Sequence, residues 1–163
     1  MLGIVVIAGL FVYPKLTDPN RGLVKFWKQA GLNCLQSHNN LFYHIHPRLL
    51  ITIDGEREPI SANQGIQGSC MSEMHTHDGT GTLHLEPIEK KDFTLNQFLS
   101  LILKKPLQRE GFTYQILVNG VLDTSNGEVV LEDHQELVID YVSEGQESVQ
   151  EKENETDETN TSE

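Results

Sequence analysis

Residues 93–106 read FTLNQFLSLILKKP and have the pattern of one short amphipathic helix. Thr94 followed by Gln97 forms a capping box, in which each side chain accepts a hydrogen bond from a backbone N–H that a helix start leaves unpaired. Apolar residues then recur at helical spacing on one face, and Lys104 and Lys105 suit the negative end of the helix dipole. Pro106 cannot continue the hydrogen-bond ladder. We therefore expect a single helix that packs through one apolar face.

Strands are expected on both sides of this helix. They are indicated by alternating apolar and polar residues, which place every second side chain on the same face. Two of the segments end in Asp54-Gly55 and Asn119-Gly120, and such dipeptides favour tight hairpin turns. The alternating segments are residues 48–54, 82–86, 114–118 and 137–142, and a shorter strand is expected over 129–131.

This order of strand, hairpin, helix and further strands predicts an α+β fold: a mixed β-sheet with one packed helix, β-grasp-like in arrangement. The 163 residues suffice for one domain and not for two. We expect an N-terminal apolar anchor and linker at 1–33, a His-rich domain at 34–142 and an acidic disordered tail at 143–163. The net charge of −12 with scattered cations predicts no nucleic-acid partner.

Residues 2–13, LGIVVIAGLFVY, are uncharged and apolar. As a helix they would cover roughly 18 Å, less than the ~30 Å of bilayer hydrocarbon. A membrane anchor whose start is missing, the core of a signal peptide and a buried element are all open; we favour the anchor, because no A-x-A cleavage pattern is present. The cations at 15, 21, 25 and 28 would hold this flank in the cytoplasm by the positive-inside rule, so charge leaves the orientation open.

The two cysteines, Cys34 and Cys70, leave two interpretations open. Outside the cytoplasm they would form a disulfide, which by chain entropy stabilises a loop of roughly 36 residues by about 3 to 4 kcal/mol. In a reducing compartment both thiols would be free, and Cys70 would become a candidate metal ligand.

Histidines are concentrated in one part of the chain: five of the seven lie between residues 44 and 84. Each His-x-His pair in extended chain points two imidazoles the same way, and neutral imidazole binds Zn(II) and Cu(II). We therefore predict a transition-metal site for copper or zinc. The candidate ligands are His44, His46, His75, His77, His84 and Cys70, with Asp78 and Glu86 as acceptors that orient the imidazoles or as a carboxylate ligand.

A plain alternative is that these histidines only occupy the polar faces of strands. A single His-x-His pair arises easily by chance, whereas two pairs and His84 within a short stretch favour a site. His38 and His134 are weaker candidates: His38 lies in a polar loop, and His134 lies at an expected turn, where we expect a solvated side chain.

Several of these motifs resemble an uncharacterised prokaryotic membrane-anchored family with the pattern C…HIH…C…HTHD…IHIE…FTLGQFF. The similarity covers about residues 34–142 and implies an extracytoplasmic domain, but it implies no activity. Asn96 stands where the family has Gly, and Glu73-Met74 replaces an aromatic and an aliphatic residue, so the pocket rim is expected to differ. The shared pattern comprises Cys34, His44, His46, Cys70, His75, His77, Asp78 and His84, with His134 as a further candidate.

Three functions follow from these patterns. The first is a membrane-tethered extracytoplasmic metal-binding domain that stores, delivers or senses copper or zinc. The second is a metal-dependent enzyme, in which three histidines hold the metal, one coordination position stays open, and Asp78 or Glu86 moves protons. The third is a β-grasp interaction module that binds no metal and contacts a partner through its sheet edge or acidic tail. The sequence leaves open whether the chain is an enzyme.

Overall fold

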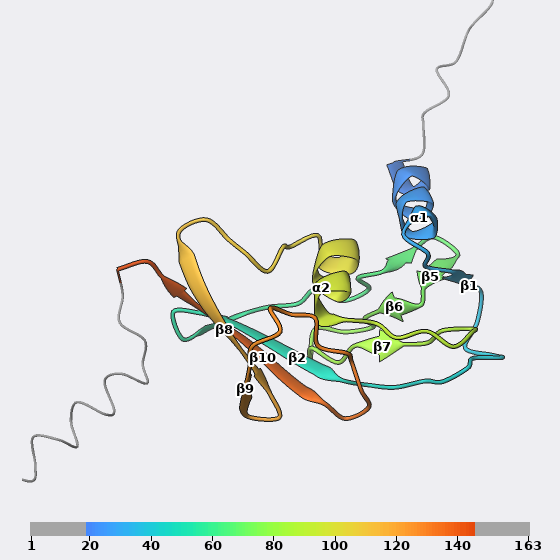
Figure 1. Cartoon of the computed structure of the whole chain (residues 1–163). Coiled ribbons are helices and arrows are strands. Elements are labelled where there is room, and N and C mark those ends of the chain that lie inside the picture. The colour runs from blue at the N-terminus through green and yellow to red at the C-terminus, as the bar shows by residue number, and fades with distance from the viewer. Residues whose placement is uncertain (1–18, 146–163) are drawn as a thin grey trace, which may run out of the picture.

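The computed structural model of this chain describes residues 19–145 and has an elongated α+β arrangement (Figure 1). A five-stranded sheet occupies one end, two smaller sheets and helix α1 (Pro19–Gln29) occupy the other, and a short helical segment lies between them. The expected α+β class is thus confirmed. The predicted anchor at 2–13 and most of the predicted acidic tail lie outside the described residues.

The large sheet is mixed, as predicted. Two strands at its centre run parallel to each other, with Ile51 level with Ile139; in chain order they are the first and the last strand of this sheet. All other neighbouring strands of the sheet are antiparallel. The hairpin before the helix contributes one strand of this central pair and the neighbour on its outer side, and the hairpin after the helix lies on the other side of the pair. In spatial order the strands are β3 (Glu56–Glu58), β2 (Arg48–Ile53), β10 (Glu136–Ser143), β8 (Phe112–Val118) and β9 (Val121–Asp123).

The predicted helix forms where expected but changes type along its length. Thr94 is its N-cap, and the reciprocal hydrogen bonds between Thr94 and Gln97 confirm the capping box. Helix α2 (Leu95–Gln97) runs directly into a π-helix, η1 (Phe98–Leu103), which ends at Lys104 in the left-handed conformation. The helical segment therefore ends before Pro106.

The main core lies between this helical segment and one face of the large sheet. Leu49 and Ile51 are buried on that face, whereas Leu50 lies on the opposite face, as the alternation predicts. The opposite face is more polar, and Thr52 there donates a hydrogen bond to Asp140. Other fully buried members of the core are Leu95, Phe98, Leu99, Ile116, Leu137, Ile139 and Tyr141.

Both predicted turn dipeptides form hairpin turns. The φ angles are 52° and 82° at Asp54-Gly55, and 51° and 78° at Asn119-Gly120, which is the left-handed region that these residues tolerate. The strand expected over 129–131 is reduced to a single bridge between Thr94 and Val130. The prediction of a regular strand at that position is therefore wrong.

Two small antiparallel sheets position the histidine-rich part of the chain. In the two-stranded sheet, only two residues of the strand expected over 82–86 form a regular strand. Ile45 adds one isolated bridge to Leu85 of that strand. Pro47 separates that bridge from the start of the long strand at Arg48. The sheets consist of β1 (Cys34–Leu35), β5 (Cys70–Ser72) and β4 (Ile66–Gln67), and of β6 (Met74–His75) and β7 (His84–Leu85).

Helix α1 lies in the segment assigned above to the anchor and linker, yet it packs on the domain. Trp27 is only 2% exposed, and its indole N–H donates to the carbonyl of Leu101 at 3.0 Å. Leu32, just after the helix, is buried as well. The packed unit therefore includes residues before 34. Within residues 19–145, no helix has the length and apolar character needed to cross a bilayer.

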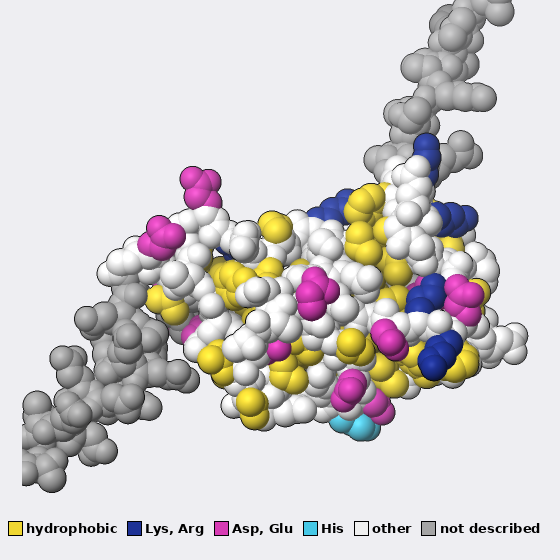
Figure 2. All heavy atoms as spheres, viewed as in Figure 1, with side chains coloured by type: hydrophobic (Ala, Val, Ile, Leu, Met, Phe, Trp, Pro, Cys, Tyr) yellow, Lys and Arg dark blue, Asp and Glu magenta, His cyan; other side chains and the backbone are white. Residues whose placement is uncertain are grey.

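The charged side chains are mixed on the face shown in Figure 2. Lys and Arg occur there as separate groups around α1, while Asp and Glu are spread over a wider area, and apolar groups lie between them. This face therefore presents no continuous surface of one charge sign.

Candidate metal centre

Six of the seven histidines gather around the side chain of Glu86. The connection between β1 and β2 supplies three of them, β6 and the turn after it supply two, and β7 supplies one and leads into Glu86. We call His38, His75 and His77 the first triad, and His44, His46 and His84 the second triad. In each triad, one ring nitrogen per residue lies within 4.8 Å of the others, a spacing that could hold a metal ion.

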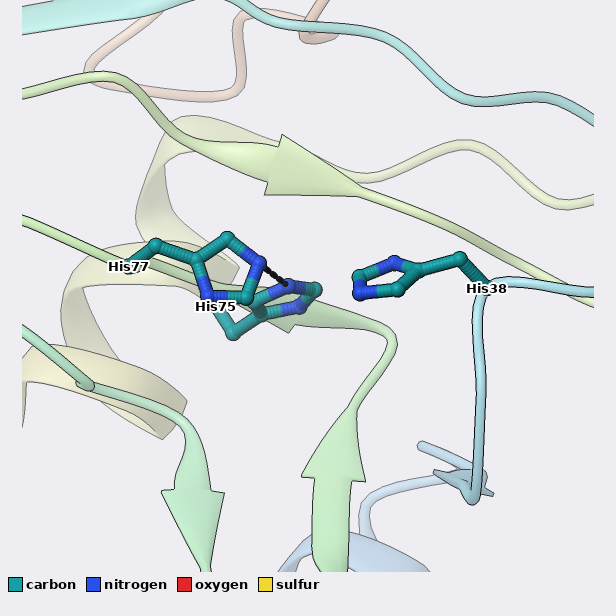
Figure 3. Close-up of side chains that lie close together, drawn as sticks. All are labelled: His38, His75 and His77. Atoms are coloured by element: carbon teal, nitrogen blue, oxygen red, sulfur yellow. Dashed lines mark hydrogen bonds between the residues drawn. The ribbon is translucent and has the colours of Figure 1, made fainter.

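The first triad combines one buried ring with two exposed ones (Figure 3). His75 Nδ1–H donates to the Ser72 carbonyl at 2.9 Å, so its Nε2 keeps a free lone pair. That Nε2 lies 3.1 Å from His77 Nε2. The His38 ring points toward both from the opposite side, with centroid distances of 6.1 Å to His75 and 5.6 Å to His77. A backbone carbonyl thus fixes the tautomer in which His75 can bind a metal.

The second triad is compact too. The ring centroids of His44 and His46 are 4.4 Å apart, and those of His46 and His84 are 4.6 Å apart. His44 Nε2 lies 3.4 Å from His84 Nδ1. The backbone of this triad is held from another part of the chain, because the His46 N–H donates to the Asp133 carboxylate at 2.8 Å.

Glu86 lies between the two triads, and its side chain is fully buried. One carboxylate oxygen is 2.7 Å from His38 Nδ1, and the other is 2.8 Å from His44 Nε2. The second oxygen is also 3.9 Å from His75 Nε2 and 3.6 Å from His84 Nδ1. Glu86 therefore contacts both triads, a position compatible with both roles expected from sequence, an acceptor that orients imidazoles or a carboxylate ligand.

Burial keeps the inner imidazoles neutral. It lowers the pKa of His75 to about 4, more than the nearby Glu86 charge raises it. Burial, together with the neighbouring His77 and His46, also lowers the pKa of His84 to about 4, and burial lowers the pKa of His46. At neutral pH these rings are therefore in the unprotonated form that metals bind.

Thr76 fixes the backbone between His75 and His77. Its side chain is buried on the other side of the chain, where the hydroxyl donates to the Ser61 carbonyl at 3.1 Å and accepts from Gln64 N–H at 3.1 Å. Its own N–H donates to the Gln64 carbonyl at 2.9 Å. This alternation directs the flanking imidazoles to the cluster, as the His-x-His spacing predicts.

Gly65 allows the preceding loop to approach β6 closely. Its φ is +80°, and a Cβ at this position would lie 2.4 Å from the Met74 carbonyl oxygen and 3.0 Å from His75 Cα. Real contacts of that kind do not occur at 2.4 Å, so a side chain at residue 65 would displace β6. The position of His75 thus depends on a residue without a side chain.

A tight turn after His77 returns the chain to His84, so that the ring centroids of these two histidines are 4.5 Å apart. Asp78 stabilises this turn, because its carboxylate accepts from the Thr80 N–H at 2.9 Å and from the Thr80 hydroxyl at 2.6 Å. The structure gives Asp78 no hydrogen bond to an imidazole among the described residues. Its carboxylate shapes the turn and does not orient a ring.

Cys34 and Cys70 form a disulfide, the first of the two interpretations left open by sequence. Cys70 therefore has no thiolate to offer a metal, and its inclusion among the ligand candidates is corrected. The bridge instead has a positioning effect, because it fixes β1, which leads to His38, against β5, which leads to His75.

Of the two weaker candidates, His134 is solvated as expected, whereas His38 joins the cluster. His134 is 87% exposed and lies outside the cluster, although its neighbour Asp133 holds the backbone of His46. His38 is 48% exposed, but its ring contacts the buried Glu86 carboxylate. The sequence feature that could have placed His38 in the cluster is its position four residues after Cys34. That position is informative only when Cys34 is known to be bonded to Cys70.

Comparison with known proteins gave no matching family model, no similar curated protein and no similar solved structure.

Proposed function

We propose that this chain is a membrane-tethered, extracytoplasmic domain that binds copper or zinc. The supporting observation is the convergence of six imidazoles on one buried carboxylate, with ring nitrogens at ligand spacing. Neutral imidazole is a ligand common to Zn(II) and Cu(II), and three or four donors make a tight site. Because the cysteines are disulfide-bonded, the donors are nitrogen and oxygen, a set that favours Cu(II) or Zn(II) over the thiolate-preferring Cu(I).

The arrangement of the cluster also supports this function. The disulfide, the Thr76 hydrogen bonds and the Asp78 turn each hold one of its segments independently of any ion. A site built in this way binds a metal with little loss of conformational entropy, because the ligands are already ordered.

The compartment is supported by the disulfide, since such bonds persist outside the reducing cytoplasm. The tether is supported by the apolar run at 2–13. Both proposals are tested together by fractionating cells that express the full chain and by labelling its thiols before and after reduction. Membrane-bound protein whose cysteines react only after reduction is expected. Soluble protein, or protein with freely reactive thiols, contradicts this part of the proposal.

For the domain itself, we propose the β-grasp arrangement. It is supported by the central parallel pair β2 and β10, by the antiparallel neighbours β3 and β8 on either side of that pair, and by the helical segment that packs on one face of the sheet. The small sheets that hold the histidines are additions to that arrangement.

An enzyme is the second candidate function, and the exposure of two histidines of the cluster favours it. His38 and His44 are 48% and 39% exposed, so solvent reaches the cluster from their side. An open coordination position there would bind water or a small anion. Cobalt-loaded protein distinguishes the two functions: a change of its visible spectrum with azide favours the enzyme, and an unchanged spectrum favours a closed binding site.

The proposal is tested by metal binding to the full-length chain prepared without a His tag. Wild-type protein is expected to retain zinc or copper at micromolar free ion, and His75→Ala and His84→Ala are expected to weaken retention by at least about tenfold. His134→Ala is the matched control, because His134 is exposed and lies outside the cluster. Less than about 0.3 ion per wild-type chain would contradict the proposal.

A further inference from the structure

We propose that the cluster is a dinuclear centre, in which the first triad holds one Cu(II) or Zn(II) ion, the second triad holds another, and the Glu86 carboxylate bridges the two. This inference rests on the proposed function and specifies how many ions the site takes and which residue couples them.

The number of donors is the first argument. Zinc sites in proteins are four-coordinate in most cases, and catalytic sites use only three protein ligands. Six imidazoles and a carboxylate exceed what one such ion can accept. With a single ion, at least three of these donors would remain together without a ligand role. Division into two sets of three nitrogens uses every donor, and both sets have ligand spacing.

The charge of Glu86 is the second argument. Its carboxylate is fully buried, and among the described residues its ion-pair contacts are all imidazoles. A buried carboxylate is costly unless a positive charge compensates it. Glu73 provides the contrast, because it is equally buried but pairs with Lys91 at 2.9 Å and accepts from Asn33 and the Ile88 N–H. Metal cations would supply to Glu86 the compensation that Lys91 supplies to Glu73.

The placement of the two carboxylate oxygens is the third argument. Oε2 lies 2.7 Å from His38 Nδ1 in the first triad, and Oε1 lies 2.8 Å from His44 Nε2 in the second triad and 2.9 Å from His38 Nδ1, so the carboxylate reaches both triads. Rings of different triads also lie close, with 5.2 Å between the centroids of His75 and His84. Dinuclear sites keep their ions about 3.5 to 4 Å apart, a separation that one carboxylate spans.

The stoichiometry is measured on the full-length chain in detergent, by equilibrium dialysis against zinc at buffered micromolar free ion. About two ions per wild-type chain are expected, and about one in each of His77→Ala and His46→Ala, because each change disables one triad. His134→Ala should retain the wild-type value. One ion in the wild type, removed entirely by either variant, would overturn the dinuclear inference and leave the proposed function standing. No bound ion would overturn the proposed function itself.

The bridge is tested separately with copper, by electron paramagnetic resonance of the fully loaded wild type. Two Cu(II) ions joined by one carboxylate should give a coupled spectrum with a half-field transition. Glu86→Gln should weaken that transition, whereas Glu89→Gln, a change at an exposed position, should not. Two independent Cu(II) signals in the wild type would overturn the bridging role. The wild-type spectrum decides this even if Glu86→Gln fails to fold.

Discussion

His38 Nδ1 lies 2.7 Å from the Glu86 carboxylate, although 48 residues separate the two in the chain. The contact exists because the disulfide fixes β1 beside β5, and His38 follows β1 closely. His38 is the most exposed of the residues that contact Glu86, so its position depends on that covalent link more than on packing.

We therefore expect the disulfide and His38 to be energetically coupled. Replacing both cysteines by serine should lower the free energy of unfolding by about 3 kcal/mol, because the unfolded chain regains the conformational entropy of the loop that the disulfide closes. In wild type, His38→Ala should weaken zinc binding, but in the double-serine background the same change should have a much smaller effect. Zinc titrations of the four proteins measure this. Equal effects of His38→Ala in both backgrounds would show that the disulfide does not position His38.

Gly65→Ala should destabilise the protein and weaken metal binding, because the new Cβ collides with the backbone of β6. Gly111→Ala is the matched control: its φ is +79°, but a Cβ there meets nothing within 4 Å. Both changes impose about 1 kcal/mol of left-handed backbone strain. Only Gly65→Ala should lower the free energy of unfolding by clearly more than that in denaturant titrations. Similar losses in both variants would contradict the close approach.

Trp27→Ala should lower the free energy of unfolding by about 3 to 5 kcal/mol, because it empties a buried aromatic site and leaves the Leu101 carbonyl without the indole donor. Phe26→Ala, on the same helix, is the control, since Phe26 is 41% exposed. Urea denaturation of the two variants provides the comparison. An equally small loss in both would mean that α1 is not part of the cooperative unit.

Glu58 should contribute to the acid sensitivity of the fold. Burial raises the pKa of Glu58, but the hydrogen bonds and charges of Lys105 and Arg109 more than offset it, so the pKa lies below its ordinary value of 4.5. A carboxyl with a lowered pKa in the folded state stabilises the protein above the ordinary pKa and loses that contribution as pH falls through the lowered one.

Urea denaturation of wild type and Glu58→Gln at a series of pH values measures this contribution. Wild type should be the more stable of the two at pH 7, and the difference should shrink as the pH falls below about 4.5. A difference that stays constant between neutral and acidic pH would mean that the ion pair with Lys105 and Arg109 adds no net stability.

Much of the large sheet and its helix was predictable because their signals are local. The capping box at Thr94, the turn dipeptides and the alternation through Leu49 and Ile51 depend on residues a few positions apart, and each was found in the structure. The strand over 129–131 failed for a related reason. The pairing around Val130 consists of one bridge to Thr94, with hydrogen bonds from Leu95 N–H to the Val129 carbonyl and from Leu131 N–H to the Phe93 carbonyl. It cannot extend into a regular strand because its partner becomes helical directly after Thr94.

Helix α1 was not predicted, because the apolar run at 2–13 favours a membrane anchor and the cations that follow it are typical of the flank of such an anchor. Local signals were nevertheless present. Pro19 suits the first helical position, and Gly31, with a φ of 82°, follows the helix. Leu23, Val24 and Trp27 share one face and pack against the core.

For the candidate site, the spacing of the His-x-His pairs correctly indicated which histidines lie together. The contribution of His38 depends on a long-range covalent link, and the central place of Glu86 depends on how β7 meets the loop before β2. Such juxtapositions follow from tertiary structure and have no local pattern.

The proposed metal centre is tested most directly by locating the bound ion through anomalous X-ray scattering from crystals of zinc-loaded protein. We predict anomalous peaks at about 2 Å from His75 Nε2 and from a ring nitrogen of His84. Peaks found only elsewhere on the chain, with none within about 5 Å of these two rings, would contradict the proposed metal centre, because zinc cannot bind an imidazole at that distance.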